Sequence, residues 1–191
     1  MLTEQHIQAR LGYVTGSMVH IAMGKGKTRD KYMDRLIQER LTGIPSESEW
    51  TGNEYTEWGD YCEPLAIEAY EEATGTKVTK ATSVHHPTIK WLSASPDGLI
   101  EGGCIEVKCM KSENHRKAID KKIKSTHVYQ MHCEMGCTGT FFCDYILFDP
   151  RMPLEWQLNI RRVKRDPQIV TKITIGIKTF LKELEQRMIG E

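Results

Sequence analysis

Two strand-like segments separated by a pair of glycines constrain this chain more than any other feature. Residues 89–97 and 104–109 are rich in strand-forming side chains, and Gly102-Gly103 lies between them. Adjacent glycines between such segments favour a tight β-hairpin. With Gly102-Gly103 as the two-residue loop, pairing runs back to place Asp97 opposite Lys108. A three-residue turn would shift this register, so the pairing is one of two alternatives.

Side-chain alternation gives the second strand a polar face and an apolar face. Glu106 and Lys108 point to the polar face, whereas Val107 points the other way and can enter the core. Directly opposed Cβ atoms lie about 5 Å apart, so Asp97 would join the polar cluster. Pro96 cannot donate a ladder hydrogen bond, and it predicts a bulge or strand end where Asp97 projects.

This cluster predicts metal-assisted hydrolysis of a phosphodiester. Two adjacent carboxylates repel each other, and a divalent cation removes that repulsion. Mg²⁺ takes oxygen ligands at about 2.1 Å and commonly keeps waters and a substrate phosphate. It would activate a bound water and neutralise charge on the phosphate, while Lys108 orients that water or stabilises the charge. The competing interpretation is an exposed hairpin with an ordinary surface ion pair.

Composition indicates a soluble globular protein with one domain over residues 1–191. Hydrophobic residues are 39% and charged residues 27% of the 191, which allows a sizeable core. No apolar segment reaches the length of a membrane span, and no signal peptide is evident at the start. Six cysteines without paired CxxC spacing favour free thiols in a cytoplasmic setting. His132, Cys133 and Cys137 are better explained by packing on a helix than by zinc.

The net charge of zero argues against a protein that coats DNA uniformly. Positive charge instead concentrates in residues 25–31, 108–124 and 161–165. Each segment alone is typical of a solvated face. Three such segments around a metal-site motif indicate a path for a polyanion.

Helices and strands alternate along the chain in the pattern of an α/β protein. Helices are expected over 17–23, 30–41, 57–74, 112–121 and 126–135, with Gly43 and Gly75 as stop signals. Extended segments are expected over 77–84, 89–97, 104–109, 141–148 and 156–164. This order predicts a mixed sheet with helices on its faces.

The last helix has the clearest signal. Asp166 is a good N-cap residue, and Pro167 is a good first helical residue. An apolar stripe follows at helical spacing, which we interpret as core or subunit contact: Ile169, Ile173, Ile177, Phe180, Leu184 and Met188.

Several short segments, taken in order, resemble the phage lambda exonuclease family of viral recombination nucleases, within the PD-(D/E)XK nuclease superfamily. The resemblance spans Arg10 to about Met152. It is carried by RLGYVTGS at 10–17, WGDYCEP at 58–64, SPDG at 95–98, EVKC at 106–109, YQ at 129–130 and FDPRM at 148–152. It implies a restriction-endonuclease-like core, with a central mixed β-sheet flanked by helices.

The resemblance also implies an activity. Members would digest the 5′-ended strand of duplex DNA processively, from 5′ to 3′, and release 5′-mononucleotides. The remaining 3′ single strand would serve annealing-type homologous recombination. The cofactor would be Mg²⁺, two ions, with Mn²⁺ as a substitute. The resemblance further implies a ring-shaped homotrimer that works with a single-strand annealing protein and has no membrane association. The protein would act in a bacterial cell and be encoded by a phage or prophage gene.

Carried over residue by residue, the resemblance assigns a metal centre. Asp97, Glu106 and the Val107 carbonyl would bind one metal ion. Glu63 would help to bind a second ion or the water around it, although by itself it is only one acid on a polar helix face. Lys108 would position the attacking water.

A second group of residues would contact DNA. Arg10 and Ser17, with Thr15 as a weaker third member, would hold the 5′-terminal phosphate, which suits an arginine fork and hydroxyl donors at a helix start. Gln130 would support the metal ligands, unless it is simply a surface glutamine. In the loop after Ser17, the basic residue that contacts DNA could be Lys25, Lys27 or Arg29. The role of His127 stays open.

Two rival functions remain. The nearest is an endonuclease of the same superfamily, such as a restriction or junction-cutting enzyme. The other is a non-catalytic DNA-binding module that retains the fold. Loss of a metal carboxylate or of the lysine would mark such a module, and Asp97, Glu106 and Lys108 are all present.

Overall fold

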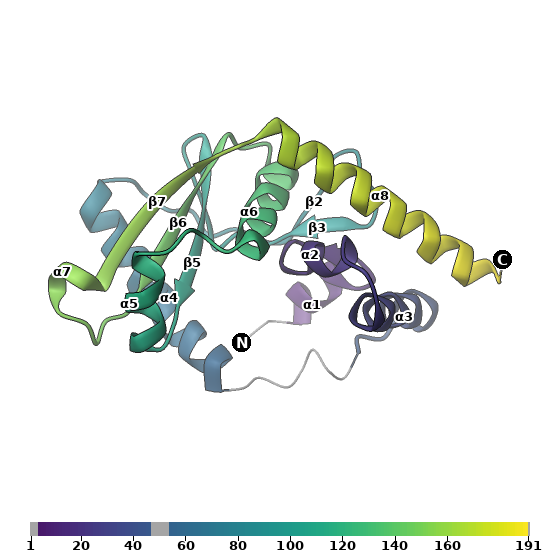
Figure 1. Cartoon of the computed structure of the whole chain (residues 1–191), viewed down its shortest axis with the longest axis horizontal. Coiled ribbons are helices and arrows are strands. Elements are labelled where there is room, and N and C mark those ends of the chain that lie inside the picture. Colours follow the sequence, from purple (N-terminus) through teal and green to yellow (C-terminus); the bar gives the residue numbers. More distant parts are fainter. Residues whose placement is uncertain (1–3, 47–53, 191) are drawn as a thin grey trace.

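The computed structural model describes residues 4–46 and 54–190, which form two mixed sheets with helices around them (Figure 1). The smaller sheet has the order β1 (Val14–Thr15), β3 (Leu92–Ala94), β2 (Val84–His85). The larger has the order β4 (Gly98–Ile100), β5 (Gly103–Cys109), β6 (Phe142–Phe148), β7 (Leu158–Lys164). In the larger sheet β5 and β6 are parallel, whereas the two outer pairings are antiparallel. The α/β prediction with a mixed sheet is confirmed.

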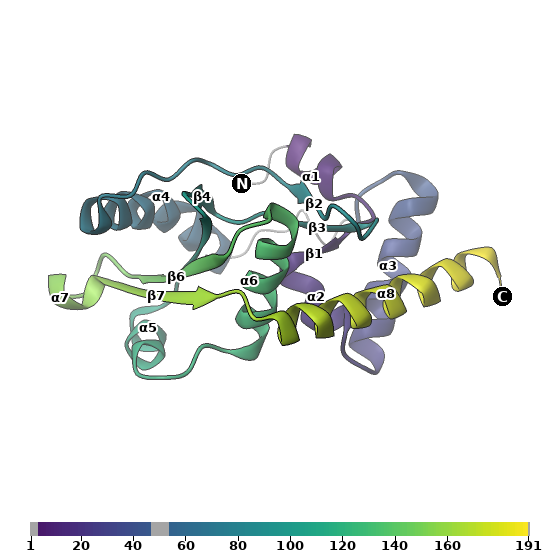
Figure 2. The same ribbon diagram turned by 90° about the horizontal axis from the view of Figure 1, so that it is seen from above.

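Helices cover both faces of the larger sheet. The helices of the described residues are α1 (Glu4–Arg10), α2 (Val19–Ala22) after the 3₁₀ turn η1 (Gly16–Met18), α3 (Lys27–Thr42), α4 (Glu54–Thr74), α5 (Ser112–Ile119), α6 (Ser125–Thr138), α7 (Leu154–Gln157) and α8 (Pro167–Ile189). The apolar side of α4 packs on one face, and α5 with α6 pack on the other (Figure 2). Among the helices of the described residues, none combines the length and apolar character that crossing a bilayer requires.

Helix α6 holds the two sheets together. Met131 and Met135 pack on the larger sheet, whereas Cys133 and Cys137 face the core shared with α8 and the smaller sheet. All six cysteines are free, as expected. His132 lies with its Nδ1 2.8 Å from the Val128 carbonyl, and its Nε2 accepts a hydrogen bond from Asp166 N–H at 3.1 Å. Both ring nitrogens are therefore already engaged within the fold.

The β4–β5 hairpin forms, but the expected register is wrong. Ile100 pairs with Gly103, so the loop is Glu101-Gly102 and the pairing is shifted by two residues. Gly102 adopts φ 69°, the left-handed region that glycine tolerates. Gly103 lies inside the strand because a Cβ there would come within 2.4 Å of the Phe142 ring. Gly103 is therefore explained by close packing across the sheet and not by the geometry of the turn.

Asp97 reaches the part of β5 that carries Glu106 and Lys108 through a bulge. Its N–H donates to the Ile105 carbonyl at 3.2 Å, although Gly98 is the register partner of Ile105. Two residues opposite one is the pattern of a β-bulge, which the preceding Pro96 predicted. Asp97 therefore does not pair directly with Lys108.

The sequence signals of α8 are confirmed. The Asp166 side chain accepts from Gln168 N–H at 2.8 Å, and Pro167 begins the helix. The apolar stripe packs into the core with α3 and the smaller sheet, fully at its centre and partly at its two ends: Ile169, Ile173, Ile177, Phe180, Leu184 and Met188.

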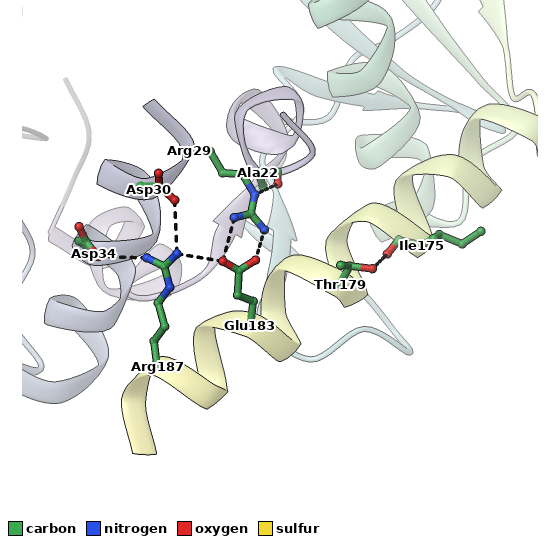
Figure 3. A network of polar contacts seen from close by, with 8 residues as sticks. All are labelled: Ala22, Arg29, Asp30, Asp34, Ile175, Thr179, Glu183 and Arg187. Carbon is green, nitrogen blue, oxygen red and sulfur yellow. Dashed lines mark hydrogen bonds and ion pairs between the residues drawn. The ribbon is translucent and has the colours of Figure 1, made fainter. Parts of the chain in front are cut away.

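Ion pairs clamp the outer half of α8 against α3 (Figure 3). Arg29 donates to both carboxylate oxygens of Glu183, at 3.2 and 2.6 Å. Arg187 contacts Glu183 as well, and it also pairs with Asp30 and Asp34 on α3. Such partly exposed pairs each contribute little, about 0–1 kcal/mol, but together they set how α8 lies on α3.

Three expected strands are shorter than predicted. Within 77–84 only β2 and an isolated bridge from Thr79 to Leu99 form. Trp91 adopts φ 66°, so β3 begins only at Leu92. In the last segment, Trp156 belongs to α7, which follows Pro153 directly, and β7 begins two residues later.

Candidate active site

The bulge and the centre of β5 bring together the predicted ligands of one metal ion. The Asp97 Oδ2 atom accepts a hydrogen bond of 2.6 Å from Val107 N–H. In a β-strand the N–H and C=O of one residue point to the same edge, so the Val107 carbonyl also faces Asp97. Glu106, one residue earlier, is only 1% exposed. Asp97, Glu106 and the Val107 carbonyl therefore lie at one point.

Glu106 is held by two side chains and keeps one oxygen without a partner. Lys108 Nζ and Gln130 Nε2 both donate to its Oε1, the latter at 2.7 Å. Its Oε2 is buried and has no hydrogen-bond partner among the described residues. A buried, unpartnered carboxylate oxygen is costly unless something else contacts it. A metal ion at this position would remove that cost.

The charges of this cluster favour a cation. Burial, and next the charge of Glu106, raise the pKa of Asp97 well above its usual value. Burial and Asp60 raise the pKa of Glu63, with Glu106 contributing. For Lys108, burial lowers the pKa but the carboxylates of Glu106 and Asp97 outweigh it, so its pKa is raised. A divalent cation among these carboxylates would relieve the burial and the repulsion that raise the pKa values of Asp97 and Glu63.

The donor set fits a hard divalent cation. It consists of carboxylate and carbonyl oxygens, the ligands that Mg²⁺ and Mn²⁺ prefer. Glu63 enters this set from α4, half-buried and close enough to raise the pKa of Asp97. The adjacent Cys62 is buried against Ile105 and Val107, which directs this turn of α4 toward the cluster.

Sequence reasoning missed Glu134. It lies one turn after Gln130 on α6, and its Oε1 accepts from the same Gln130 Nε2 at 3.0 Å. Burial, and next Glu106, raise its pKa well above the usual value. Because both carboxylates accept from the one amide nitrogen, the Gln130 side chain is fixed in orientation. An acid four residues after Gln130 was the only sequence signal for this role.

Glu134 also forms a compact group with two thiols. Ligand atoms of Cys104, Glu134 and Cys143 lie within 4.8 Å of one another. All three residues are fully enclosed in the core. This group therefore cannot contact a DNA phosphate directly.

The expected phosphate-binding segment lies against the helix that carries Gln130. The Thr15 and Ser17 hydroxyls are 3.5 Å apart, and the intervening Gly16 packs on the Gln130 carbonyl, which would lie 3.8 Å from a Cβ. The Arg10 Nε is buried and has no partner among the described residues. An unpartnered guanidinium nitrogen suits an anionic ligand.

Helix α3 holds this segment in place. Gly12 N–H donates to Glu39 Oε2 at 3.0 Å, and Arg40 Nε donates to the Gly12 carbonyl at 2.8 Å. Gly12 has φ 71° and a Cβ would meet the Arg40 side chain at 2.7 Å. The turn between Arg10 and Thr15 is thus anchored through both backbone groups of Gly12.

The structure narrows the choice of loop base. Lys25 and Lys27 are exposed. Arg29 instead binds Glu183, donates to the Ala22 carbonyl at 3.2 Å and lies 5.0 Å from the Phe180 ring centre (Figure 3). Arg29 is occupied in holding α8, so Lys25 and Lys27 remain as the candidate DNA contacts.

His127 lies beside the active site. Its Nδ1 is 2.8 Å from the Tyr145 hydroxyl. Burial, and next the positive charge of Lys108, lower the pKa of His127 to about 4. The imidazole is therefore neutral near pH 7, and Tyr145 is its hydrogen-bond partner.

A mixed sheet whose strand β5 carries Glu106 and Lys108, with Asp97 at the bulge before β4, is the arrangement typical of a PD-(D/E)XK nuclease. The profile of the YqaJ-like viral recombinase domain matches residues 5–140, and the chain belongs to this family. The lambda-exonuclease-like resemblance is thereby confirmed, and the chain is a nuclease of the viral recombinase-type alkaline exonuclease family.

Solved structures agree with this assignment. An alkaline exonuclease, LHK-Exo from Laribacter hongkongensis, is 38% identical with a TM-score of 0.91, over 97% of this chain and 94% of that chain. The same enzyme in complex with dAMP matches with a TM-score of 0.92 and the same identity and coverage. A phage-related exonuclease from Haemophilus somnus 129PT shares the fold, at 18% identity, a TM-score of 0.70, and 92% and 95% coverage. A search of curated proteins finds no match.

Proposed function

We propose that this chain is a Mg²⁺-dependent exonuclease that digests the 5′-ended strand of duplex DNA processively, from 5′ to 3′. The observation that carries the proposal is the convergence of Asp97, Glu106 and the Val107 carbonyl beside Lys108 and Gln130. The 38% identical relative is an alkaline exonuclease, which supports the same reaction class. The product would be 3′ single-stranded DNA for annealing-type recombination.

In the proposed reaction, water attacks the phosphorus between the first and second nucleotides. The bond to the 3′ oxygen of the first nucleotide breaks, and that oxygen leaves as a hydroxyl after gaining a proton. Bound Mg²⁺, in one or two ions held by Asp97, Glu106, the Val107 carbonyl and Glu63, would lower the pKa of water and neutralise charge on the phosphate. Lys108, positively charged and held by Glu106, orients the water and stabilises the developing charge.

The phosphate pocket explains why digestion would run from the 5′ end. Each cut releases a 5′-mononucleotide and leaves a new 5′-phosphate on the shortened strand. Arg10, Ser17 and Thr15 would bind that phosphate again, and the next phosphodiester would then lie at the metal centre. Binding one end after every cut favours repeated cutting of the same strand.

Strand-specific labels test the function directly. On a blunt duplex carrying a 5′-phosphate on one strand only, we expect a label at that 5′ terminus to appear first as a mononucleotide, while the complementary strand, which ends in a 5′-hydroxyl, is shortened far more slowly. Covalently closed circular DNA should remain intact. Linearised circles would favour an endonuclease, undegraded DNA would favour a non-catalytic module, and early release of a 3′-terminal label would contradict the polarity.

Mg²⁺ should stabilise the protein more at high pH than at low pH. The pKa values of Asp97 and Glu63 are raised, so their contribution to metal-free stability is present below their usual pKa of about 4 and is lost as pH rises through the raised values. Mg²⁺ at about 100 times Kd would add roughly 2.7 kcal/mol, or about 5–10 °C in Tm. Differential scanning fluorimetry at pH 5.5 and 8.5 measures this. Mn²⁺ should stabilise the protein in the same way, and Asp97→Asn should reduce the increase in Tm that Mg²⁺ produces. An equal increase in Tm at both pH values would contradict this prediction.

The remaining proposals concern assembly and setting. Residues 1–191 would act as one nuclease domain, in a homotrimeric ring that threads duplex DNA and works with a single-strand annealing protein. The protein would act in the cytoplasm of a bacterial cell, and a phage or prophage gene would encode it. Sedimentation equilibrium tests the ring, because a trimer requires three times the chain mass of 21.9 kDa.

A further inference from the structure

A basic cavity lies beside the active site on the face of the larger sheet that α5 and α6 cover. We call it the α5–α6 pocket; its volume is about 260 Å³. Lysines and aromatic side chains line it from α5, the following loop, α6 and β6: Lys117, Lys121, Lys122, Lys124, His127 and Tyr145. This volume lies just below the range of about 300–1,000 Å³ that is typical of small-molecule sites, so the pocket can hold at most one nucleotide and not a duplex.

The charge of the pocket is one-sided. Five lining residues are basic, namely the four lysines and Arg161, and none of the lining residues is acidic. Arg161 is occupied, because it donates to the carbonyls of Ala118, Ile119 and Lys121 at 2.7 Å each. Lys117 pairs with Glu113. The ammonium groups of Lys121, Lys122 and Lys124 have no hydrogen-bond or ion-pair partner in the part of the chain that the structure describes, and all three side chains are exposed.

The inner wall of the pocket is aromatic and adjoins the metal ligands. His127 and Tyr145 line it, with ring centroids 5.7 Å apart. Tyr145 is the register partner of Glu106 across the β5–β6 pairing. The pocket is thus one strand away from the residue that holds the proposed metal ion.

We propose that the α5–α6 pocket binds one nucleoside phosphate unit, with its phosphate near Lys122 and Lys124 and its base near His127. Free lysines attract the phosphate, and aromatic side chains accept a base of any sequence. The identity of the ligand rests on the proposed nuclease function. The same chemistry has two sources, a nucleotide of the DNA strand next to the cut or the released mononucleotide.

The first arm of the test measures DNA affinity. In a Lys108→Ala background, which prevents digestion, Lys122→Glu combined with Lys124→Glu should weaken binding of a labelled duplex about tenfold at 0.15 M salt and reduce the salt slope by about 2. Lys178→Glu combined with Lys182→Glu, two exposed lysines on α8, is the charge-matched control and should change the affinity far less. Thermal unfolding verifies that all variants are folded.

The second arm measures binding of deoxyadenosine 5′-monophosphate by calorimetry, in the otherwise unmodified protein and in the same variants. Weaker DNA binding alone assigns the pocket to the strand, and weaker mononucleotide binding assigns it to the released product. If the folded variants bind both the duplex and the mononucleotide with unchanged affinity, the proposed role of the pocket is refuted. If the unmodified protein digests no DNA, the proposed function fails, and the mononucleotide arm still decides whether the pocket binds a nucleoside phosphate.

Discussion

Lys108→Ala is expected to lower the rate of DNA digestion about a thousandfold, the upper end of what removing one such donor costs. Lys108 Nζ donates to Glu106 Oε1, and the alanine variant loses both this bond and the positive charge beside the reacting phosphate. The free-energy cost is about 4 kcal/mol in the barrier. DNA binding should persist, because the other basic groups remain. Single-turnover digestion of a 5′-labelled duplex at saturating Mg²⁺ measures the effect.

Two variants make this result specific. Lys182→Ala removes an exposed lysine far along α8 and should keep full activity. Lys108→Arg keeps the charge but replaces a compact ammonium with a planar fork, so we expect only partial recovery. Digestion at the unmodified rate by Lys108→Ala would refute the role of this residue, provided that the protein is folded and binds DNA.

A 5′-phosphate should speed digestion of a DNA end by roughly ten- to a hundredfold over a 5′-hydroxyl, and Arg10→Ala should abolish that preference. The Arg10 Nε is buried without a partner, and a hydrogen bond from a charged donor contributes about 1.5–3 kcal/mol. Ser17→Ala removes a neutral donor and should lose only part of the preference. Rates on matched duplexes that differ only at the 5′ terminus measure it.

This experiment carries its own control, because residue and phosphate form a double-mutant cycle. Arg10→Ala should digest both ends at the rate at which the unmodified protein digests the 5′-hydroxyl end. If that variant still prefers the phosphate, another group binds it. If the unmodified protein shows no preference, the pocket does not exist.

Local signals predicted the helices well. Asp166 and Pro167 begin α8, and Gly43 ends α3 with φ 68° and its N–H donating to Glu39. The spacing of apolar residues on α8 also identified its buried stripe. These features depend on a few neighbouring residues, so the chain encodes them without reference to distant partners.

The hairpin register depended on a contact outside the hairpin. Two adjacent glycines satisfied a symmetrical loop, but the Phe142 ring of β6 leaves no room for a side chain at residue 103. In the structure Gly103 pairs with Ile100 within the hairpin, and the loop lies one residue earlier than expected, at Glu101-Gly102. Asp97 then reaches its place through the bulge after Pro96.

In the candidate site, too, the sequence predicts some features, and only the tertiary structure reveals the others. Strand alternation places Glu106 and Lys108 on one face of β5, whereas Asp97 reaches them through the bulge and not through the pairing that the sequence predicted. The position of Glu134 and the engagement of Arg29 by Glu183 do not follow from the sequence, because they depend on which side chains α6 and α8 present to distant segments.

The chain's local chemistry thus specified its elements, its nuclease motif and the acids that would hold a metal ion. Packing between segments far apart along the chain set the hairpin register, fixed Gln130 between two carboxylates and created the α5–α6 pocket. The physical reason is the distance along the chain over which each interaction acts. Caps, turns and periodicity act over a few residues, whereas the burial of Glu106 and Glu134 arises only when β5 and α6 meet.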